Sequence, residues 1–235
     1  MMRSFKIVIL WCCFGFGLSG LAQETQGSFS TQITNTYSYG YLLRKPQNIK
    51  TKKPLIVFLH GSGEKGTDLE KVKIHGPLKY VKHHELYAYI LAPQCPENTY
   101  WESESLYQLI LKVSQENNVD ANRIYLTGLS MGGWGTWNLA IAHPDMFAAI
   151  VPIAGFVDRV PLIEDCKIAA IPTWIFHGLL DDVVDVNYSS VIYKRLKACN
   201  ANVKLTIFDD ANHDSWSRVY DNPEIYEWML QQIKK

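Results

Sequence analysis

A serine between glycines is the feature of this chain best suited to chemistry. Ser130 is the central residue of Gly128-Leu-Ser-Met-Gly132, which follows an apolar run at 124–126 and precedes a helix-like run at 133–143. A strand, a sharp turn and a helix in this order raise a serine hydroxyl above the end of a sheet, and glycines on both sides let the backbone turn and pack closely. The free N–H groups at such a helix start also favour an anionic intermediate. A glycine-rich helix start alone gives the same pattern, so the partners of the serine matter.

A serine hydroxyl is a weak nucleophile and needs a base, usually a histidine that a carboxylate orients. In sheets of this type the partners follow in the order serine, acid, histidine. His213 is the single histidine after the acidic loop at 181–185, and it follows the last expected strand. We therefore predict His213 as the base. His60 and His177 each precede a glycine at a strand end, and we interpret both as structural.

The residues leave the acid open among Asp181, Asp182 and Asp185, which all lie in or beside the loop after the penultimate strand. Asp209 and Asp210 are too close to His213 in sequence to reach its ring easily from behind.

We expect an oxyanion hole made of two backbone N–H groups. The first is that of Met131, the residue after the nucleophile. The second comes from the loop His60-Gly-Ser-Gly63, with Ser62 as the first choice and Gly63 as the second. Three tryptophans lie near these residues in sequence, and we predict that Trp134, Trp216 and Trp101 contact substrate, although any of them could instead fill the core.

The elements that must position these residues alternate between strand and helix. We expect strands at 34–44, 55–59, 88–92, 124–126, 147–154, 173–176 and 203–208. We expect helices at 69–81, interrupted by Gly76-Pro77, and at 106–115, 133–143, 186–199 and 223–233. Such alternation predicts an α/β fold with a mainly parallel twisted sheet and helices on both faces. Ligands bind at the carboxyl ends of the strands in these sheets, where the serine, the acids and His213 all fall.

The composition indicates one globular domain at 23–235 after a signal peptide at 1–22. The chain has 235 residues, of which 47% are hydrophobic and 20% charged. Residues 1–22 have a basic start, an apolar run too short for a typical membrane span and a small-residue end, so we predict a secreted or periplasmic protein; the alternative is a retained N-terminal anchor. We expect no membrane association after cleavage.

The charges and cysteines exclude several classes of partner. The chain has 23 basic and 23 acidic residues and no basic block, so we expect no nucleic-acid partner. No metal-binding spacing occurs, and we expect neither a metal nor another cofactor. Of Cys95, Cys166 and Cys199, at most one pair can form a disulfide, and the sequence does not say which. It does not predict the oligomeric state either.

With these residues in place, the chain resembles the α/β-hydrolases. Within that fold it is similar to the small secreted esterases of the phospholipase/carboxylesterase and polyhydroxybutyrate-depolymerase-like groups, which are often labelled prolyl-oligopeptidase-like "predicted peptidases". The resemblance covers roughly residues 54–233. It is carried by Leu59-His-Gly-Ser-Gly-Glu-Lys-Gly66, Gly128-Leu-Ser-Met-Gly-Gly-Trp-Gly-Thr136, His177-Gly-Leu-Leu-Asp-Asp-Val-Val184 and Asn212-His-Asp-Ser-Trp216.

The resemblance implies that the first aspartate of the third motif, Asp181, is the catalytic acid. The chain departs from the pattern at Asp185, where relatives often have proline. No β-propeller domain precedes the hydrolase unit, which speaks against the peptidase role in the label.

We therefore expect a serine carboxylesterase that works through an acyl-enzyme. Residues 155–172 leave no room for a large cap, so the site should be open to bulky esters, including acetyl or feruloyl esters of polysaccharides. The alternatives are a serine peptidase or amidase with the same residues and, further removed, a binding protein on a hydrolase fold that has lost its activity.

Overall fold

The computed structural model describes residues 37–47, 50–158 and 165–234. They belong to one compact unit, Thr36–Lys235. The signal peptide predicted at 1–22 lies outside the described residues, as do the first residues of the strand expected at 34–44.

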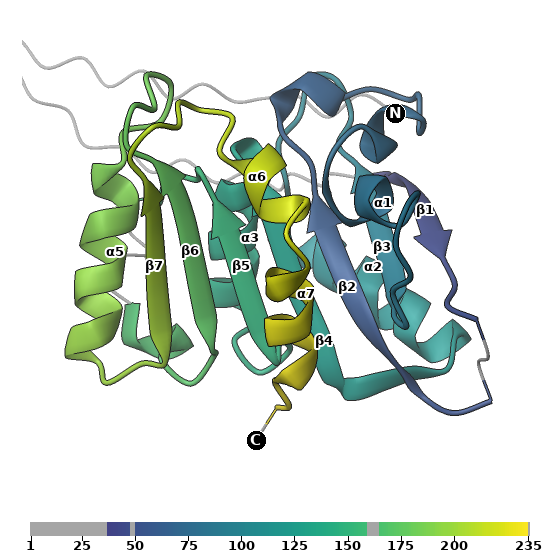
Figure 1. Ribbon diagram of the computed structural model, residues 1–235. Coiled ribbons are helices and arrows are strands. Elements are labelled where there is room, and N and C mark those ends of the chain that lie inside the picture. Colours follow the sequence, from purple (N-terminus) through teal and green to yellow (C-terminus); the bar gives the residue numbers. More distant parts are fainter. Residues whose placement is uncertain (1–36, 48–49, 159–164, 235) are drawn as a thin grey trace, which may run out of the picture. The chain divides into compact units, whose positions relative to one another are not determined.

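The core of the fold is a seven-stranded sheet in the order β1-β3-β2-β4-β5-β6-β7 (Figure 1). Only β1 is antiparallel to its neighbour, β3, and the other neighbours are parallel. The bounds are β1 Gly40–Arg44, β2 Lys53–Leu59, β3 Tyr89–Gln94, β4 Val119–Leu129, β5 Ala149–Ile153, β6 Thr173–Gly178 and β7 Val203–Phe208. This arrangement confirms the predicted α/β-hydrolase fold without a large cap domain.

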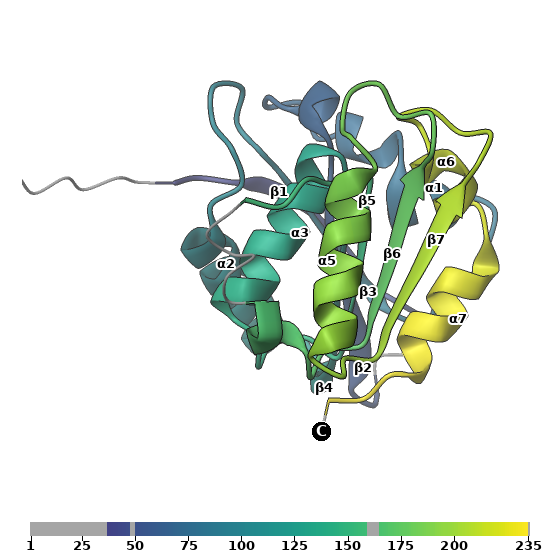
Figure 2. The same ribbon diagram turned by 90° about the vertical axis from the view of Figure 1, so that its left-hand side faces the viewer.

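Helices cover both faces of the sheet (Figure 2). One face carries α2 Ser103–Glu116, α3 Met131–Ala142 and α5 Asn187–Ala198, and the other carries α1 Gly76–Tyr80, α6 Trp216–Tyr220 and α7 Pro223–Gln231. Among the described residues, three short 3-10 helices lie in the connections: η1 Ser62–Glu64, η2 Lys71–Lys73 and η3 Asp165–Ile168. Across the described part of the chain, no helix is both long and apolar enough to cross a bilayer.

The continuous apolar runs of the strands arise because both faces are covered. In β2, Leu55, Val57 and Leu59 face the cluster under α2 and α3, whereas Ile56 and Phe58 face the cluster under α1 and α6. All five are at most 1% exposed, as expected for an inner parallel strand. Truncation of such a side chain to alanine costs about 2–5 kcal/mol.

The helix expected at 69–81 is interrupted near Gly76-Pro77, as predicted, and consists of the separate segments η2 and α1. Gly76 has φ +71°, which places the break just before a new helix. Pro77 lies in the first turn of α1, where its missing N–H is no loss.

Helix α3 is buried around most of its circumference. Nine of its 12 residues are buried, and its apolar side chains do not gather on one face. It is enclosed by the sheet and by neighbouring elements such as α2. A helix enclosed in this way cannot shift without repacking the core, so its N-terminus is rigidly placed.

The structure also settles the cysteine pairing. Cys166 in η3 is bonded to Cys199 at the end of α5, 33 residues along the chain, and Cys95 is a buried free thiol. The sequence left this pairing open because it depends on α5 packing beside η3, which is a tertiary contact.

We predict that removal of this disulfide destabilises the protein. Closing a loop of this length constrains the unfolded chain, and its loss should lower the free energy of unfolding by about 3–4 kcal/mol. The measurement is urea unfolding of a Cys166→Ser/Cys199→Ser double variant. A reductant should bring the wild type to the same midpoint and leave the double variant unchanged; a wild type insensitive to reductant would contradict the prediction.

Candidate active site

Ser130 occupies a strained turn between β4 and α3. Its backbone has φ 52° and ψ −115°, in a region that non-glycine residues seldom adopt. Such a residue costs on the order of 1–3 kcal/mol unless its surroundings hold it. Here its N–H donates to the Ile153 carbonyl at 2.9 Å, and its own carbonyl accepts from the Trp134 N–H at 3.0 Å.

The glycines around Ser130 are required by contact. A Cβ on Gly132 would overlap the carbonyl oxygen of Leu59, and one on Gly128 would overlap the carbonyl of Gly132. Helix α3 therefore starts in direct contact with the end of β2. This contact accounts physically for the Gly-x-Ser-x-Gly pattern found in the sequence.

Three predicted residues form one hydrogen-bonded row. The Ser130 hydroxyl lies 2.9 Å from His213 Nε2, and His213 Nδ1 lies 2.8 Å from Asp181 Oδ2 and 3.0 Å from Oδ1. His213 comes from the loop after β7, and Asp181, which contacts His213 from the other side, comes from the loop after β6. With Nδ1–H donating to the carboxylate, Nε2 is left free to accept the serine proton.

The environment of the carboxylates separates Asp181 from its neighbours. The Asp181 side chain is fully buried, and its Oδ1 accepts the N–H groups of Val183 and Val184 at 2.9 and 2.8 Å. Burial raises the pKa of this carboxyl, but the hydrogen bonds from His213 and the two valines outweigh burial and lower it overall. Asp181 therefore stays ionised, whereas Asp182 is exposed and Asp185 accepts from the Asn187 N–H.

His177 is a partner of the acid that the sequence did not reveal. Its Nε2 lies 2.9 Å from the Val184 carbonyl and 3.1 Å from Asp181 Oδ2, while Nδ1 lies 2.7 Å from the Ser189 hydroxyl. Burial lowers the pKa of His177, so the ring is neutral. His177 has a structural role, as predicted, and the part of the structure that it supports is the loop carrying Asp181. Its position four residues before Asp181 was the available signal.

The predicted oxyanion donors are each the first residue of a helix. Met131 is the first residue of α3 and Ser62 the first of η1, and first-turn N–H groups have no acceptor within their own helix. The Gly61 N–H is instead held by Glu64 Oε2 at 2.9 Å. Since Gly132 touches the backbone of Leu59 and His60, the loop carrying Ser62 lies against the Ser130 turn.

His60 supports that loop from below. Its Nε2 accepts the Cys95 N–H at 3.0 Å, so Nδ1 carries the hydrogen that is donated to the Gly61 carbonyl at 2.6 Å. Burial lowers the pKa of His60 from 6.5 to about 4, because an imidazolium would be desolvated and its second N–H would face another donor.

The prediction that Trp101 contacts substrate is wrong, because its side chain is buried. Its indole is only 4% exposed, packs edge-on against His60 and donates to the His60 carbonyl at 3.3 Å. We therefore no longer expect it to contact substrate. An apolar ring with one polar atom suits a buried site as well as a sugar, and the sequence alone could not distinguish the two.

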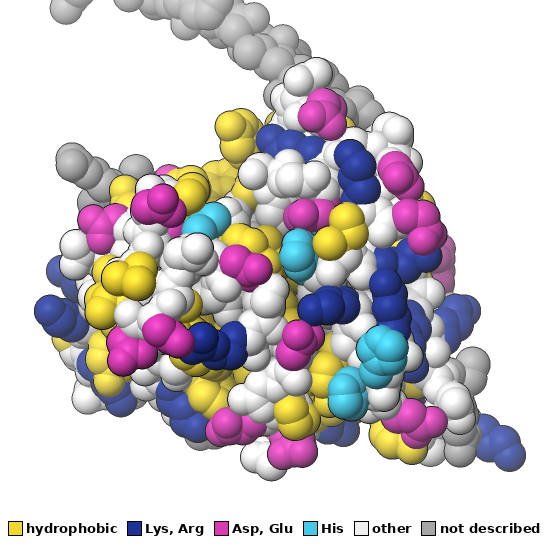
Figure 3. Space-filling model, turned by 45° about the horizontal axis from the view of Figure 1, so that its top comes forward, with side chains coloured by type: hydrophobic (Ala, Val, Ile, Leu, Met, Phe, Trp, Pro, Cys, Tyr) yellow, Lys and Arg dark blue, Asp and Glu magenta, His cyan; other side chains and the backbone are white. Residues whose placement is uncertain are grey.

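The other two tryptophans remain beside the serine row. Trp216 stands edge-on to the His213 ring with centroids 5.0 Å apart. Trp134 is partly exposed on the first turn of α3 and donates to Asp158 Oδ2 at 2.8 Å. Figure 3 turns this end of the molecule toward the viewer and shows acidic, basic and hydrophobic side chains interspersed over it.

Comparisons with known proteins agree with this geometry. The model of the phospholipase/carboxylesterase family matches residues 92–222, a span that includes Ser130, Asp181 and His213. A solved structure described as a thermostable esterase superposes with a TM-score of 0.71 at 36% identity, covering 82% of this chain and 59% of that one.

Two curated relatives are more distant. Poly(3-hydroxyalkanoate) depolymerase C of Paucimonas lemoignei is 28% identical over 143 residues, which are 54% of this chain and 33% of that protein. Acetylxylan esterase A of Emericella nidulans is 28% identical over 151 residues, which are 56% of this chain and 48% of that protein. The chain thus spans less than half the length of either relative.

We predict that Asp181→Asn lowers kcat by about 10⁴, because the amide favours the imidazole tautomer that cannot accept the serine proton. Steady-state hydrolysis of p-nitrophenyl acetate measures the loss, with circular dichroism as the check on folding. The matched control is Asp182→Asn, one residue away and exposed, which should stay near the wild-type rate. A large loss in the control and none in Asp181→Asn would assign the acid to Asp182.

A second prediction concerns pH and stability. The folded pKa of His60 lies below its unfolded value, so between pH 6.5 and about 4 the unfolded chain binds more protons and stability falls as the pH falls. The shift corresponds to roughly 3 kcal/mol lost at the acidic end. Urea unfolding across this range should show a shallower decline for His60→Gln than for the wild type. Equal slopes would refute the assignment, and His83→Gln, at an exposed site, controls for loss of a histidine.

Proposed function

Since the chain belongs to the phospholipase/carboxylesterase family, we propose that it is a serine carboxylesterase that hydrolyses esters through a covalent acyl-enzyme. The observation that carries the proposal is the row from Ser130 through His213 to the buried Asp181, with both hydrogen bonds at 2.8–2.9 Å. The structure with 36% identity is described as an esterase.

The first half of the proposed reaction forms the acyl-enzyme. Ser130 Oγ attacks the ester carbonyl carbon as its proton passes to His213 Nε2, and the ionised Asp181 stabilises the resulting imidazolium. The carbonyl oxygen becomes an anion held by the N–H groups of Met131 and Ser62. The intermediate then expels the alcohol, which takes the proton from Nε2.

The second half reverses these roles with water. Water gives a proton to His213 Nε2 and attacks the acyl carbon, and the collapse of the second intermediate returns the proton to Ser130 Oγ and releases the acid. No step requires a metal or an organic cofactor.

We further propose that the substrates are acetyl or feruloyl esters on polysaccharides, met outside the cytoplasm. Three observations support this. The connection between β5 and β6, residues 154–172, is short for a cap. The Cys166–Cys199 disulfide suits an oxidising compartment, in line with the predicted signal peptide. One of the relatives is an acetylxylan esterase.

We predict that Ser130→Ala lowers the kcat of ester hydrolysis on the order of a millionfold. The same substitution should abolish labelling by a fluorophosphonate probe. The wild type should be labelled at Ser130, as mass spectrometry of the peptide would show. Labelling elsewhere would refute the nucleophile. In matched acetyl ester and acetanilide substrates the ester should react much faster, and comparable rates would favour an amidase.

A further inference from the structure

A hollow of about 540 Å³ opens beside the serine row, between the loop after β5 and the start of α5. Its lining is partly apolar and partly polar. The lining residues are Phe156, Val157, Asp158, Asp185, Asn187, Tyr188 and Val191.

The hollow adjoins the reactive serine through two elements. Phe156 stacks on Trp134, with centroids 5.7 Å apart and an interplanar angle of 20°, and Trp134 lies on the first turn of the helix that Ser130 starts. On the opposite wall, Asp185 belongs to the same loop as Asp181. The hollow is thus connected to the Ser130 turn through Trp134 and to the loop of Asp181 through Asp185.

The aromatic rings of the hollow belong to a longer row that includes two exposed tyrosines. The ring centroids of Tyr188 and Phe156 are 6.2 Å apart, and at the other end of the row those of Tyr100 and Trp134 are 6.0 Å apart. Tyr188 is 43% exposed and Tyr100 64% exposed. Large rings left in water in contact with one another indicate a binding surface rather than a core.

The polar part of the hollow is acidic. Asp158 is held by the Trp134 indole N–H at 2.8 Å and by Asn138 Nδ2 at 3.5 Å, and Asp185 by the Asn187 N–H at 2.8 Å. Each carboxylate keeps lone pairs for further donors. The two charged side chains in the described lining are both carboxylates, which disfavour an anion and offer acceptors to hydroxyl groups.

We propose that this hollow binds an uncharged sugar chain, the part of the substrate that carries the ester. The faces of the sugar rings pack on Phe156 and Tyr188, and their hydroxyls donate to Asp158 and Asp185. The role of this subsite in catalysis rests on the proposed esterase function, but its affinity for sugar does not. The charge of the walls selects neutral chains over chains of uronic acids.

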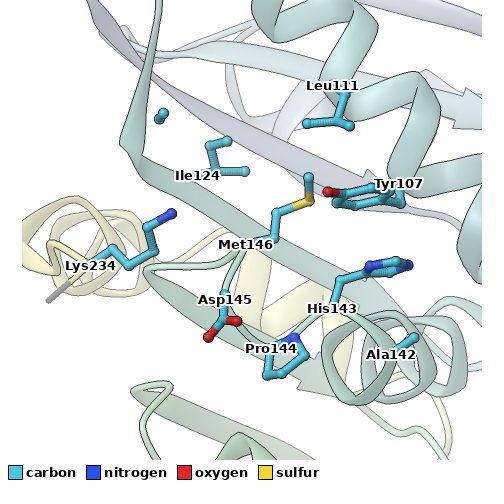
Figure 4. A pocket seen from close by; sticks show the side chains of 10 residues that line it. Tyr107, Leu111, Ile124, Ala142, His143, Pro144, Asp145, Met146 and Lys234 are labelled. Carbon is cyan, nitrogen blue, oxygen red and sulfur yellow. The ribbon is translucent and has the colours of Figure 1, made fainter.

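A second hollow, of about 320 Å³, does not compete for this role (Figure 4). It lies at the far end of α3, where Tyr107 and His143 stack with centroids 3.9 Å apart beside Met146. The 12 residues of α3 separate it from Ser130 by roughly 18 Å. An ester at Ser130 does not reach it.

The test measures sugar binding directly, without turnover. Isothermal titration of the wild type with xylohexaose, cellohexaose, mannohexaose and hexagalacturonate should show binding of at least one neutral chain and weaker binding of the uronic chain. Tyr188→Ala should raise the Kd for the neutral chain at least fivefold; its exposure makes unfolding an unexpected result. The matched control is Tyr87→Ala, an exposed tyrosine that precedes β3 in the other half of the sheet and should bind like the wild type.

A double variant tests the electrostatic part. Asp158→Asn/Asp185→Asn should narrow the gap in Kd between neutral and uronic chains. The proposal is overturned if no neutral chain binds at millimolar concentration, or if Tyr188→Ala binds the neutral chain like the control. It is also overturned if the uronic chain binds better than the neutral ones, or if methyl ferulate binds at Tyr188 and sugars do not. If sugars do not bind but Ser130 is labelled, only the proposed sugar subsite is ruled out. If sugars bind but Ser130 is not labelled, only the proposed esterase function is ruled out.

Discussion

The close contact between the start of α3 and the ends of its neighbouring strands is the constraint on which the site depends. Gly132 touches the carbonyls of Leu59 and His60, and Gly133 touches the carbonyl of Ile153. This contact brings three segments close together: the turn at Ser130, the loop with Ser62 and the loop that carries Phe156. A side chain larger than hydrogen at either glycine would separate them, since the touching atoms are backbone and have little room to yield.

A second dependence runs through the buried charge of Asp181. A carboxylate removed from water is costly unless donors surround it, and here these are His213, His177 and two backbone N–H groups. Those donors come from β6, its following loop and the loop after β7. The charge that orients His213 thus also holds three segments together, and Ser189 of α5 joins them through His177.

Local patterns predicted most of the fold, and the order of the motifs predicted Ser130 and His213. Apolar runs marked the strands, and the glycine turn marked Ser130, because both arise from contacts close in sequence. Asp181 could be chosen from three aspartates only by resemblance, since its burial depends on the loop closing over it. The roles of Trp101 and His177 and the pairing of Cys166 depend on which distant segments pack together, and the same residue types would serve equally well in other surroundings.

The all-round burial of α3 has a consequence for the order in which the molecule becomes active. A helix without a polar face is poorly stable alone, so it gains its structure only when the sheet is there to receive it. The strained conformation of Ser130 in turn persists only while β2, β4 and β5 hold the turn. The arrangement of Ser130 with His213 and Asp181 is therefore a property of the finished fold, and an unfolded chain carries an ordinary serine at this position.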